Sequence, residues 1–290
     1  MYKVSIIGAG VVGTATGYLL KKNGYSIVGI GSRTIESAKK AKKFIGEGEP
    51  STDLCSISKK ADIIFITTPD DLIEKVCNRL AEEKCINEGA VVFHMSGALS
   101  SDVLKSVKDI GANVASLHPL QSLASVKQAV KNLPGSFFCI EGDDKALSIA
   151  REIVNALRGK IITLKPYKKP LYHGGASVAS NFLVATIGFG IELLEKAGIE
   201  KDVALEALLP LIKGTIMNIE KLRIPSALTG PISRGDLSIV DTHLRSILKE
   251  MPRRLKLYIE LARYTVEIAH DKGTIRENVV EKFNSLFDKY

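Results

Sequence analysis

Three polar side chains with catalytic chemistry recur every fourth residue in "LYHGGASVASNFLVA", residues 171 to 185. His173, Ser177 and Asn181 would therefore project from one face of a helix. An imidazole can exchange a proton, whereas a hydroxyl and an amide can orient a carbonyl by hydrogen bonds. Polar groups on a buried helix cost about 1 to 3 kcal/mol each unless paired, so this face is either part of a site or hydrogen-bonded to another helix.

The same helix contains a local conflict with helix propensity. Gly174 and Gly175 each disfavour a helix interior by about 1 kcal/mol relative to Ala. Such a conflict predicts close approach of the backbone to a ligand or to another domain.

Two further polar stretches follow expected strands. "FHMSGALSS" (93 to 101) places Ser96 and Gly97 directly after a strand, and "SLHPLQS" (116 to 122) does the same for His118. Ser96 is a candidate polar contact to a ligand. His118 can bind a substrate carboxylate or carbonyl, although a histidine that caps a loop is an alternative interpretation.

A polar loop interrupts the helical C-terminal part of the chain. In "SALTGPISRGD" (226 to 236), Arg234 can clamp a carboxylate and Asp236 can orient a histidine or an ammonium group. His243, seven residues beyond Asp236, is interpreted as an ordinary histidine on a helix face.

The clearest binding motif lies near the N-terminus. The pattern GxGxxG follows a strand and opens a helix, as in the turns that bind dinucleotides. Gly8 would allow the tight turn, Gly10 the approach of a pyrophosphate, and Gly13 close packing of helix on strand. The expected contact residues are Gly8, Ala9, Gly10, Val11, Val12 and Gly13. A turn made for packing alone is the alternative.

The end of the second strand indicates which dinucleotide binds. The sequence there is Ser32, Arg33, Thr34, without the carboxylate that usually binds the ribose 2′-hydroxyl of NAD. A hydroxyl and a guanidinium can bind a 2′-phosphate, which predicts NADP as the cofactor. Alternatively, Thr34 caps the next helix and Arg33 is solvated.

A third strand adds to this site. Thr67, Thr68 and Pro69 follow it at the carboxyl edge of the sheet, where open α/β sheets bind ligands. We expect them to line the dinucleotide.

Alternating β-branched runs and helical patterns position these residues. The runs predict an α/β fold, with a doubly wound, mostly parallel sheet covered by helices on both faces. The expected strands are residues 3–8, 26–30, 62–68, 90–95, 113–117, 136–141 and 160–164. Long helices, 170–197 and 202–222 among them, follow "KPYKKP", so we predict a Rossmann domain over 1–166 and a helical domain over 167–290.

Composition limits the partners. The net charge of +8 comes from lysines scattered over helix faces rather than gathered in blocks, which argues against nucleic-acid binding. The four cysteines show no CxxC spacing, so we expect them reduced and packed, with no metal site. No apolar run was expected to be long enough to cross a bilayer, which predicts a cytoplasmic protein.

Taken together, the motifs resemble a known group. GxGxxG, SR, TPD, HxSGAL, SLHPLQS, YHxxxxxxSN and LTGPIxRGD resemble the Rossmann-like oxidoreductases that carry a C-terminal helical domain of unknown function. That group is similar to the 6-phosphogluconate dehydrogenase, ketopantoate reductase, pyrroline-carboxylate reductase and prephenate dehydrogenase families. The resemblance implies an NADP-linked dehydrogenase that dimerises through the helical domain and binds substrate in the cleft between domains.

One departure bears on the mechanism. Some relatives use a lysine on the first long helix as acid/base, four residues before an asparagine, but here Ser177 precedes Asn181 at that spacing. His173, one turn earlier, is the substitute that we expect to donate the proton. Ser96-Gly97 matches the Asn-Gly of ketopantoate reductases, and His118-Pro119 matches the His-Pro of prephenate dehydrogenases.

We therefore predict that the protein transfers hydride between NADP(H) and a small carboxylated substrate. A 2-oxo acid such as ketopantoate is the first substrate to test. Asn181 and Ser96 would orient the carbonyl, and His118 and Arg234 would hold the carboxylate. Two alternatives remain open: an imine or deazaflavin-linked reductase of the same architecture, and a non-enzymatic NADP(H) sensor.

Overall fold

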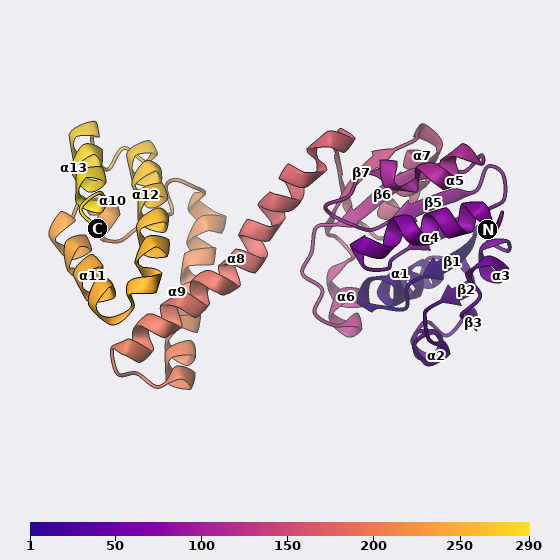
Figure 1. Ribbon diagram of the computed structural model, residues 1–290, viewed down its shortest axis with the longest axis horizontal. Coiled ribbons are helices and arrows are strands. Elements are labelled where there is room, and N and C mark those ends of the chain that lie inside the picture. Colours follow the sequence, from indigo (N-terminus) through magenta and orange to yellow (C-terminus); the bar gives the residue numbers. More distant parts are fainter. The chain divides into compact units, whose positions relative to one another are not determined.

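The computed structural model describes residues 1–290 and divides into two compact units. The first, Met1–Leu183, is a sheet with helices, and the second, Val184–Tyr290, is helical (Figure 1). The boundary expected near residue 166 is where the last strand has ended, whereas the first compact unit continues into the long helix α8 (Lys169–Lys196).

The first unit is built on one eight-stranded sheet with the order β3-β2-β1-β4-β5-β6-β7-β8. All neighbouring strands are parallel except β6 and β7, which confirms the predicted mostly parallel α/β sheet. The strands are β1 (Lys3–Ile7), β2 (Ser26–Gly31), β3 (Glu49–Ser51), β4 (Ile63–Ile66), β5 (Val91–His94), β6 (Asn113–Pro119), β7 (Phe137–Gly142) and β8 (Lys160–Thr163). Strand β3 was not predicted because its three residues, "EPS", contain no β-branched run.

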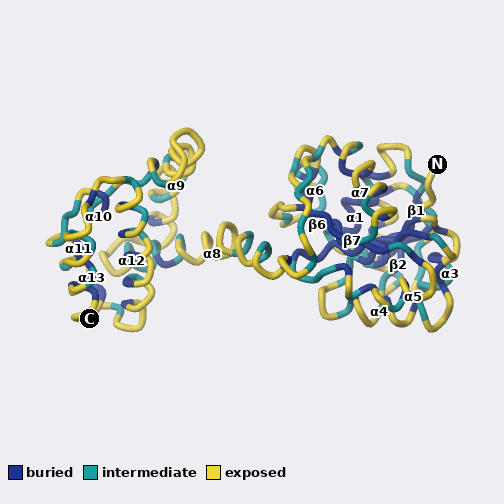
Figure 2. Tube along the Cα trace, turned by 90° about the horizontal axis from the view of Figure 1, so that it is seen from above, coloured by how far each residue is buried: buried dark blue, intermediate teal, exposed yellow.

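Alternate strand residues face opposite sides of this sheet, and helices cover both sides. Ile6 belongs to a core shared with α1, α2, α6 and α7, while Ile7 belongs to a second core shared with α3, α4 and α5. Figure 2 shows the buried residues concentrated along the strands. The helices are α1 (Val11–Lys22), α2 (Ile35–Ile45), α3 (Leu54–Ser58), α4 (Asp70–Glu82), α5 (Lys105–Asp109), α6 (Val126–Asn132) and α7 (Asp144–Ala156), with the short 3₁₀ turn η1 (Ser101–Leu104).

The chain after the sheet is helical, as predicted. The turn η2 (Pro166–Lys168) leads into α8, and α9 (Lys201–Leu222) follows within a few residues of its expected bounds. In the second unit, Val240, Leu244 and Phe283 form part of a separate apolar core. Its remaining elements are α10 (Pro231–Arg234), α11 (Leu237–Glu250), η3 (Pro252–Arg254), α12 (Leu255–Asp271) and α13 (Glu277–Phe287).

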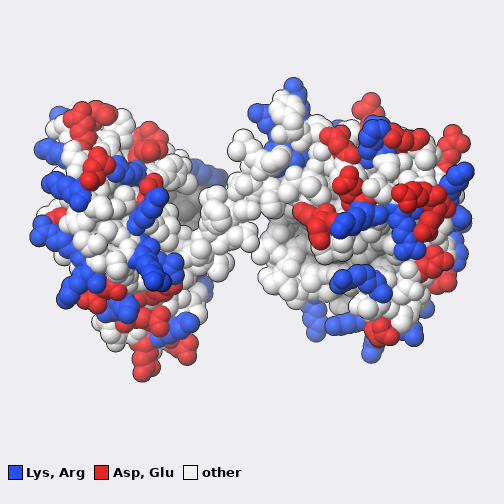
Figure 3. All heavy atoms as spheres, in the orientation of Figure 1, with Lys and Arg blue, Asp and Glu red and all other residues white.

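Charged groups of both signs are interspersed on the visible face of each unit, but the middle of α8 is uncharged (Figure 3). The 31-residue helical segment 166–196 is long and apolar enough to cross a membrane by length and composition alone. The expectation that no segment reaches this length was therefore wrong. The expectation was based on uninterrupted apolar runs. In this helix, Gly, Ala and Ser are interspersed among apolar residues, and charged residues are almost absent. One such helix is weak evidence of a membrane span.

The cysteines also correct an expectation. Cys55 in α3 and Cys85 after α4 form a disulfide, although they were expected to be reduced. The two residues are 30 positions apart in sequence, so no local spacing indicates a pairing that the packing of α3 near α4 creates. Cys77 and Cys139 are free and buried, as expected of packed thiols.

Candidate active site

The turn between β1 and α1 is packed against the end of β4. A Cβ atom added to Gly13 would lie 2.1 Å from the carbonyl oxygen of Gly8, and Gly8 itself has a φ of +114°. The Thr67 hydroxyl donates to the Gly8 oxygen at 2.8 Å. Only glycine fits these two positions, because side chains there would collide with the backbone or require a disfavoured conformation.

The same turn leaves the start of α1 open. Its N-cap residue, Gly10, provides no side-chain hydrogen bond, the first turn has no acidic residue, and a Cβ at Gly10 would have no neighbour within 4 Å. The free N–H groups and the positive end of the helix dipole are thus accessible to an anion. These features fit the bridging phosphates of a dinucleotide.

A cavity of about 610 Å³ lies beside this turn. Three cations, Arg33, Lys75 and Arg79, line it, and no carboxylate does. Arg79 also forms an ion pair with Glu83, which does not line the cavity; Arg79 Nε lies 2.7 Å from the Glu83 carboxylate. The cavity therefore has the charge that a phosphorylated ligand requires.

Most of the residues expected to contact a cofactor line this cavity. They are Gly8, Ala9, Gly10, Ser32, Arg33, Thr67, Thr68 and Pro69. Val11, Val12 and Gly13 form the first turn of α1, outside the lining. The Thr34 side chain instead accepts a hydrogen bond from Ser37 N and caps α2, which was the alternative interpretation.

Lys75 and Arg79 were not among the predicted residues, because both belong to α4, distant in sequence from the glycine turn. Their spacing of four residues on one helix face was the available signal.

The loop after β5 forms a tight turn at the carboxyl edge of the sheet. The Ser96 hydroxyl donates to Asp70 at 2.8 Å and accepts from the backbone N–H groups of Ala98 and Leu99. Ser96 is buried, so its hydroxyl holds the turn and Asp70 together rather than being free for a substrate.

Beyond β6, a second cavity of about 740 Å³ brings together four of the predicted residues. His118, His173, Ser177 and Asn181 line it together with Tyr172, and His118 contacts both Tyr172 and His173. The Tyr172 hydroxyl lies 2.9 Å from His118 Nδ1, and the rings of His118 and His173 are 6.4 Å apart, edge to face. The lining contains no Lys, Arg, Asp or Glu.

His118 is uncharged at neutral pH. Burial, reinforced by electrostatic repulsion from Lys169 and His173, lowers the pKa of His118 from 6.5 to about 4. It can therefore offer a substrate a hydrogen bond but not a full positive charge.

Lys169 is the functional candidate that the sequence analysis missed. It is fully buried beneath this edge, and its Nζ donates to the Ser96 carbonyl oxygen at 2.9 Å and to the Ser116 hydroxyl at 2.6 Å. Desolvation lowers the pKa of Lys169. It precedes His173 by four residues, and this spacing was the signal, obscured by the prolines around it.

The sequence predicts close approach of a ligand or another domain to Gly174 and Gly175. A Cβ at Gly174 or Gly175 would have no neighbour within 4 Å, so no other part of the chain approaches them closely.

Arg234 and Asp236 form an ion pair with each other at 2.9 Å in the second unit, and their role toward a substrate stays a prediction.

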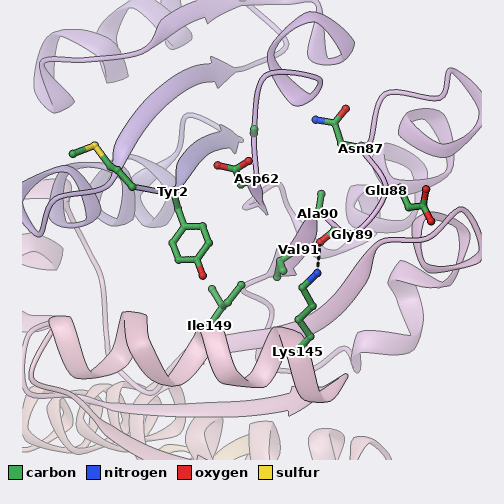
Figure 4. A pocket seen from close by; sticks show the side chains of 11 residues that line it. Tyr2, Asp62, Asn87, Glu88, Gly89, Ala90, Val91, Lys145 and Ile149 are labelled. Carbon is green, nitrogen blue, oxygen red and sulfur yellow. Dashed lines mark hydrogen bonds between the residues drawn. The ribbon is translucent and has the colours of Figure 1, made fainter.

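A third cavity, of about 430 Å³, lies at the opposite edge of the sheet. Tyr2, Asp62 and Val91, at the amino ends of β1, β4 and β5, line it (Figure 4). Its lysine, Lys145, already donates to the Gly89 oxygen at 3.0 Å. None of the residues predicted for chemistry lies there.

Comparisons with known proteins identify the domains and the fold. Residues 1–119 match the Rossmann-like domain, and residues 136–265 match a domain described as a domain of unknown function (DUF2520). The chain therefore combines a Rossmann-like domain with this second domain. A comparison with curated proteins finds no match.

Solved structures resemble the chain over nearly its whole length. A proposed NADP oxidoreductase from Bacteroides fragilis is 25% identical, with a TM-score of 0.75 over 92% of this chain and 98% of that one. A protein from Thermotoga maritima is 28% identical, with a TM-score of 0.70 over 93% and 99% of the two chains. A pyrroline-5-carboxylate reductase from Coxiella burnetii, 14% identical with a TM-score of 0.59 over 93% and 98%, shares the fold.

The pKa of His118 provides a direct test of this site. The imidazole should remain neutral until the pH approaches about 4. Because the unfolded chain binds this proton near pH 6.5, we expect His118 to lower the free energy of unfolding as the pH falls from 6.5 to 4, but not above 6.5. NMR titration of the histidine rings, with His118 assigned by the loss of its signal in His118→Asn, measures the midpoint. A midpoint near 6.5 would contradict the buried environment.

Proposed function

We propose that this chain is an NADP(H)-dependent oxidoreductase that transfers hydride to or from a small carboxylated substrate, with a 2-oxo acid such as ketopantoate tested first. The observation that carries the proposal is the open start of α1 at Gly10, beside a cavity with three cations and no carboxylate in its lining. The similarity to a proposed NADP oxidoreductase over nearly the whole chain supports it.

The first turn of α1 would hold the bridging phosphates, and Ser32 with Arg33 would hold the 2′-phosphate. Arg33 is exposed at the end of β2 and lines the cavity, so its guanidinium is free to form two parallel bonds to a phosphate. Lys75 and Arg79 add positive charge from α4.

The second cavity would hold the substrate. NADP(H), when bound, supplies or accepts the hydride. His173 would donate a proton to the developing alkoxide, and Asn181 and Ser177, on the same helix, would orient the reacting group. Neutral His118 would add a hydrogen bond, fixed in direction by Tyr172.

The protein is also proposed to be a homodimer through its helical part. Apolar side chains on α9 are exposed, including Leu211 at 65% and Met217 at 51%. Exposed apolar patches of this kind mark protein interfaces, and a second copy of the chain is the simplest partner.

Arg33→Ala should weaken NADPH binding by about ten- to a hundredfold, since it removes one or two charged hydrogen bonds to the 2′-phosphate. NADH, which has no such phosphate, should bind almost unchanged. Calorimetric titration of both cofactors measures this, with Arg151→Ala, exposed on α7 and outside the cavity, as the control. Equal losses for NADPH and NADH would refute the assignment of Arg33.

His173→Ala should lower turnover by about a hundredfold or more, the usual effect of losing a general acid, without a large change in NADPH affinity. Oxidation of NADPH is followed by its absorbance against a panel of 2-oxo acids and cyclic imines. His270→Ala, exposed on α12, is the matched control. If His173→Ala turns over substrate as fast as the wild type, His173 is not part of the mechanism. If the wild type binds NADPH tightly but turns over no compound in the panel, the alternative of a non-enzymatic NADP(H) sensor is favoured.

Leu211→Glu should convert a dimer to a monomer, because it places a charge in the proposed apolar interface. Light scattering should give twice the 31.4 kDa of one chain for the wild type and for the control Lys213→Glu. A monomeric wild type would overturn the proposed dimer.

A further inference from the structure

The amino group of Lys169 is buried without an ion pair. Its Nζ has two neutral hydrogen-bond partners, the Ser96 carbonyl oxygen and the Ser116 hydroxyl. The nearest acidic side chain in the neighbouring strand, Glu141, is instead bonded to Ser101 through both of its oxygens. Burying a lysine in this way is unfavourable, and the lysine is therefore expected to act on the groups that it contacts.

One of those groups is the peptide that joins Ser96 to Gly97. This peptide is trans, so its carbonyl and its N–H point in opposite directions. Because the carbonyl oxygen of Ser96 faces Lys169, the N–H of Gly97 is directed away from Lys169. The Ser116 hydroxyl donates to the same oxygen at a longer distance, 3.4 Å, so the bond from Lys169, at 2.9 Å, is the shorter of the two bonds that set the direction of this N–H.

The Gly97 N–H has no acceptor within the protein. The N–H of Ser96 bonds His94 Nδ1, and those of Ala98 and Leu99 bond the Ser96 hydroxyl, so Gly97 alone in this turn is left without a partner. Gly97 is buried. A buried N–H without an acceptor is costly and rare, which points to a ligand that supplies one.

Gly97 is not in the lining of either cavity, but it lies between the strands whose ends line them. It follows β5, which lies between β4, whose end lines the first cavity, and β6, whose His118 lines the second. A Cβ at Gly97 would lie 2.7 Å from His173 and 2.8 Å from His118 Nε2. Only a glycine leaves both imidazoles in place beside this N–H.

We propose that the Gly97 N–H donates a hydrogen bond to a carbonyl oxygen of the reacting ligands, and that Lys169 is the positioning residue that aims and polarises it. This rests on the proposed function. The oxygen belongs either to the carboxamide of the nicotinamide ring or to the carbonyl of the substrate. A donor fixed in advance by a second hydrogen bond on the same peptide is suited to stabilise charge on such an oxygen.

The sequence provides a selective probe. Ser96-Gly97 is the only Ser-Gly dipeptide in the chain, so labelling serine with ¹³C at the carbonyl and glycine with ¹⁵N gives one NMR cross-peak among the 24 glycines. Its carbon frequency reports the hydrogen bonds that the Ser96 oxygen accepts from Lys169 and Ser116, and its change in Lys169→Met isolates the bond from Lys169. Its proton frequency reports the bond to a ligand. Both are measured on the full-length protein.

A downfield move of the Gly97 proton with NADP⁺ alone, but not with 2′-phospho-ADP-ribose, identifies the carboxamide as the acceptor. A downfield move only when oxamate is added to the NADP⁺ complex identifies the substrate carbonyl. No downfield move with either, while calorimetry shows that NADP⁺ is bound, overturns this inference and leaves the proposed function standing. Absence of NADP⁺ binding overturns the proposed function itself.

Lys169→Met should reduce the ligand-induced move and, if the carboxamide is the acceptor, weaken NADPH binding by about three- to tenfold without changing that of 2′-phospho-ADP-ribose. Lys168→Met, an exposed neighbour, is the matched control and should leave both unchanged. An unaltered move in Lys169→Met would exclude Lys169 as the positioning residue. If Lys169→Met does not fold, the wild type provides the test. A Ser96 carbonyl carbon frequency equal to that of a carbonyl without a hydrogen bond from a charged donor would exclude Lys169 as the positioning residue.

Discussion

Close packing of the β1–α1 turn against the end of β4 is the constraint on which the candidate site depends. With 2.1 Å between a Cβ at Gly13 and the Gly8 oxygen, helix and strand can approach only without side chains. The N-cap residue Gly10 lies in the same turn and has no side chain, so the first N–H groups of α1 have no side-chain partner. Tight packing at Gly8 and Gly13 and an accessible anion site at Gly10 therefore belong to one turn.

The strand order then arranges the chemistry along one edge. The glycine turn follows β1, Thr67 follows β4, the Ser96-Gly97 turn follows β5, and His118 lies in β6. These strands are adjacent in this order, so residues up to about 110 positions apart in sequence lie along one edge of the sheet. Lys169 links two of these strands, because its Nζ donates to the Ser96 carbonyl oxygen after β5 and to the Ser116 hydroxyl on β6.

The sequence predicted what short-range patterns encode. The β-branched runs indicated seven of the eight strands, and helical spacing indicated α8 and α9. Gly8, Gly10 and Gly13 could be assigned to a turn because their geometry depends only on a strand and the helix after it. The roles of the predicted catalytic side chains stay predictions.

Features that need distant segments were missed. Lys75 and Arg79 reach the first cavity from α4, Cys85 pairs with a cysteine in α3, and Lys169 is buried only because α8 begins beneath β5 and β6. Lys169 lies between two prolines, a pattern that indicates the end of structure, yet proline is tolerated in the first turn of a helix, and α8 starts there.

The reversed direction of β7 has a consequence for how this fold can diversify. Because β7 runs antiparallel to β6, the connection from Leu120 to Ser136 both leaves and re-enters the sheet at the edge where the candidate site lies. Leu120, Gln121 and Leu123 from this connection line the second cavity, and no residue from it lines the first. Insertions or deletions in this connection would change the lining of the second cavity and leave the lining of the first, with its glycine turn, unchanged.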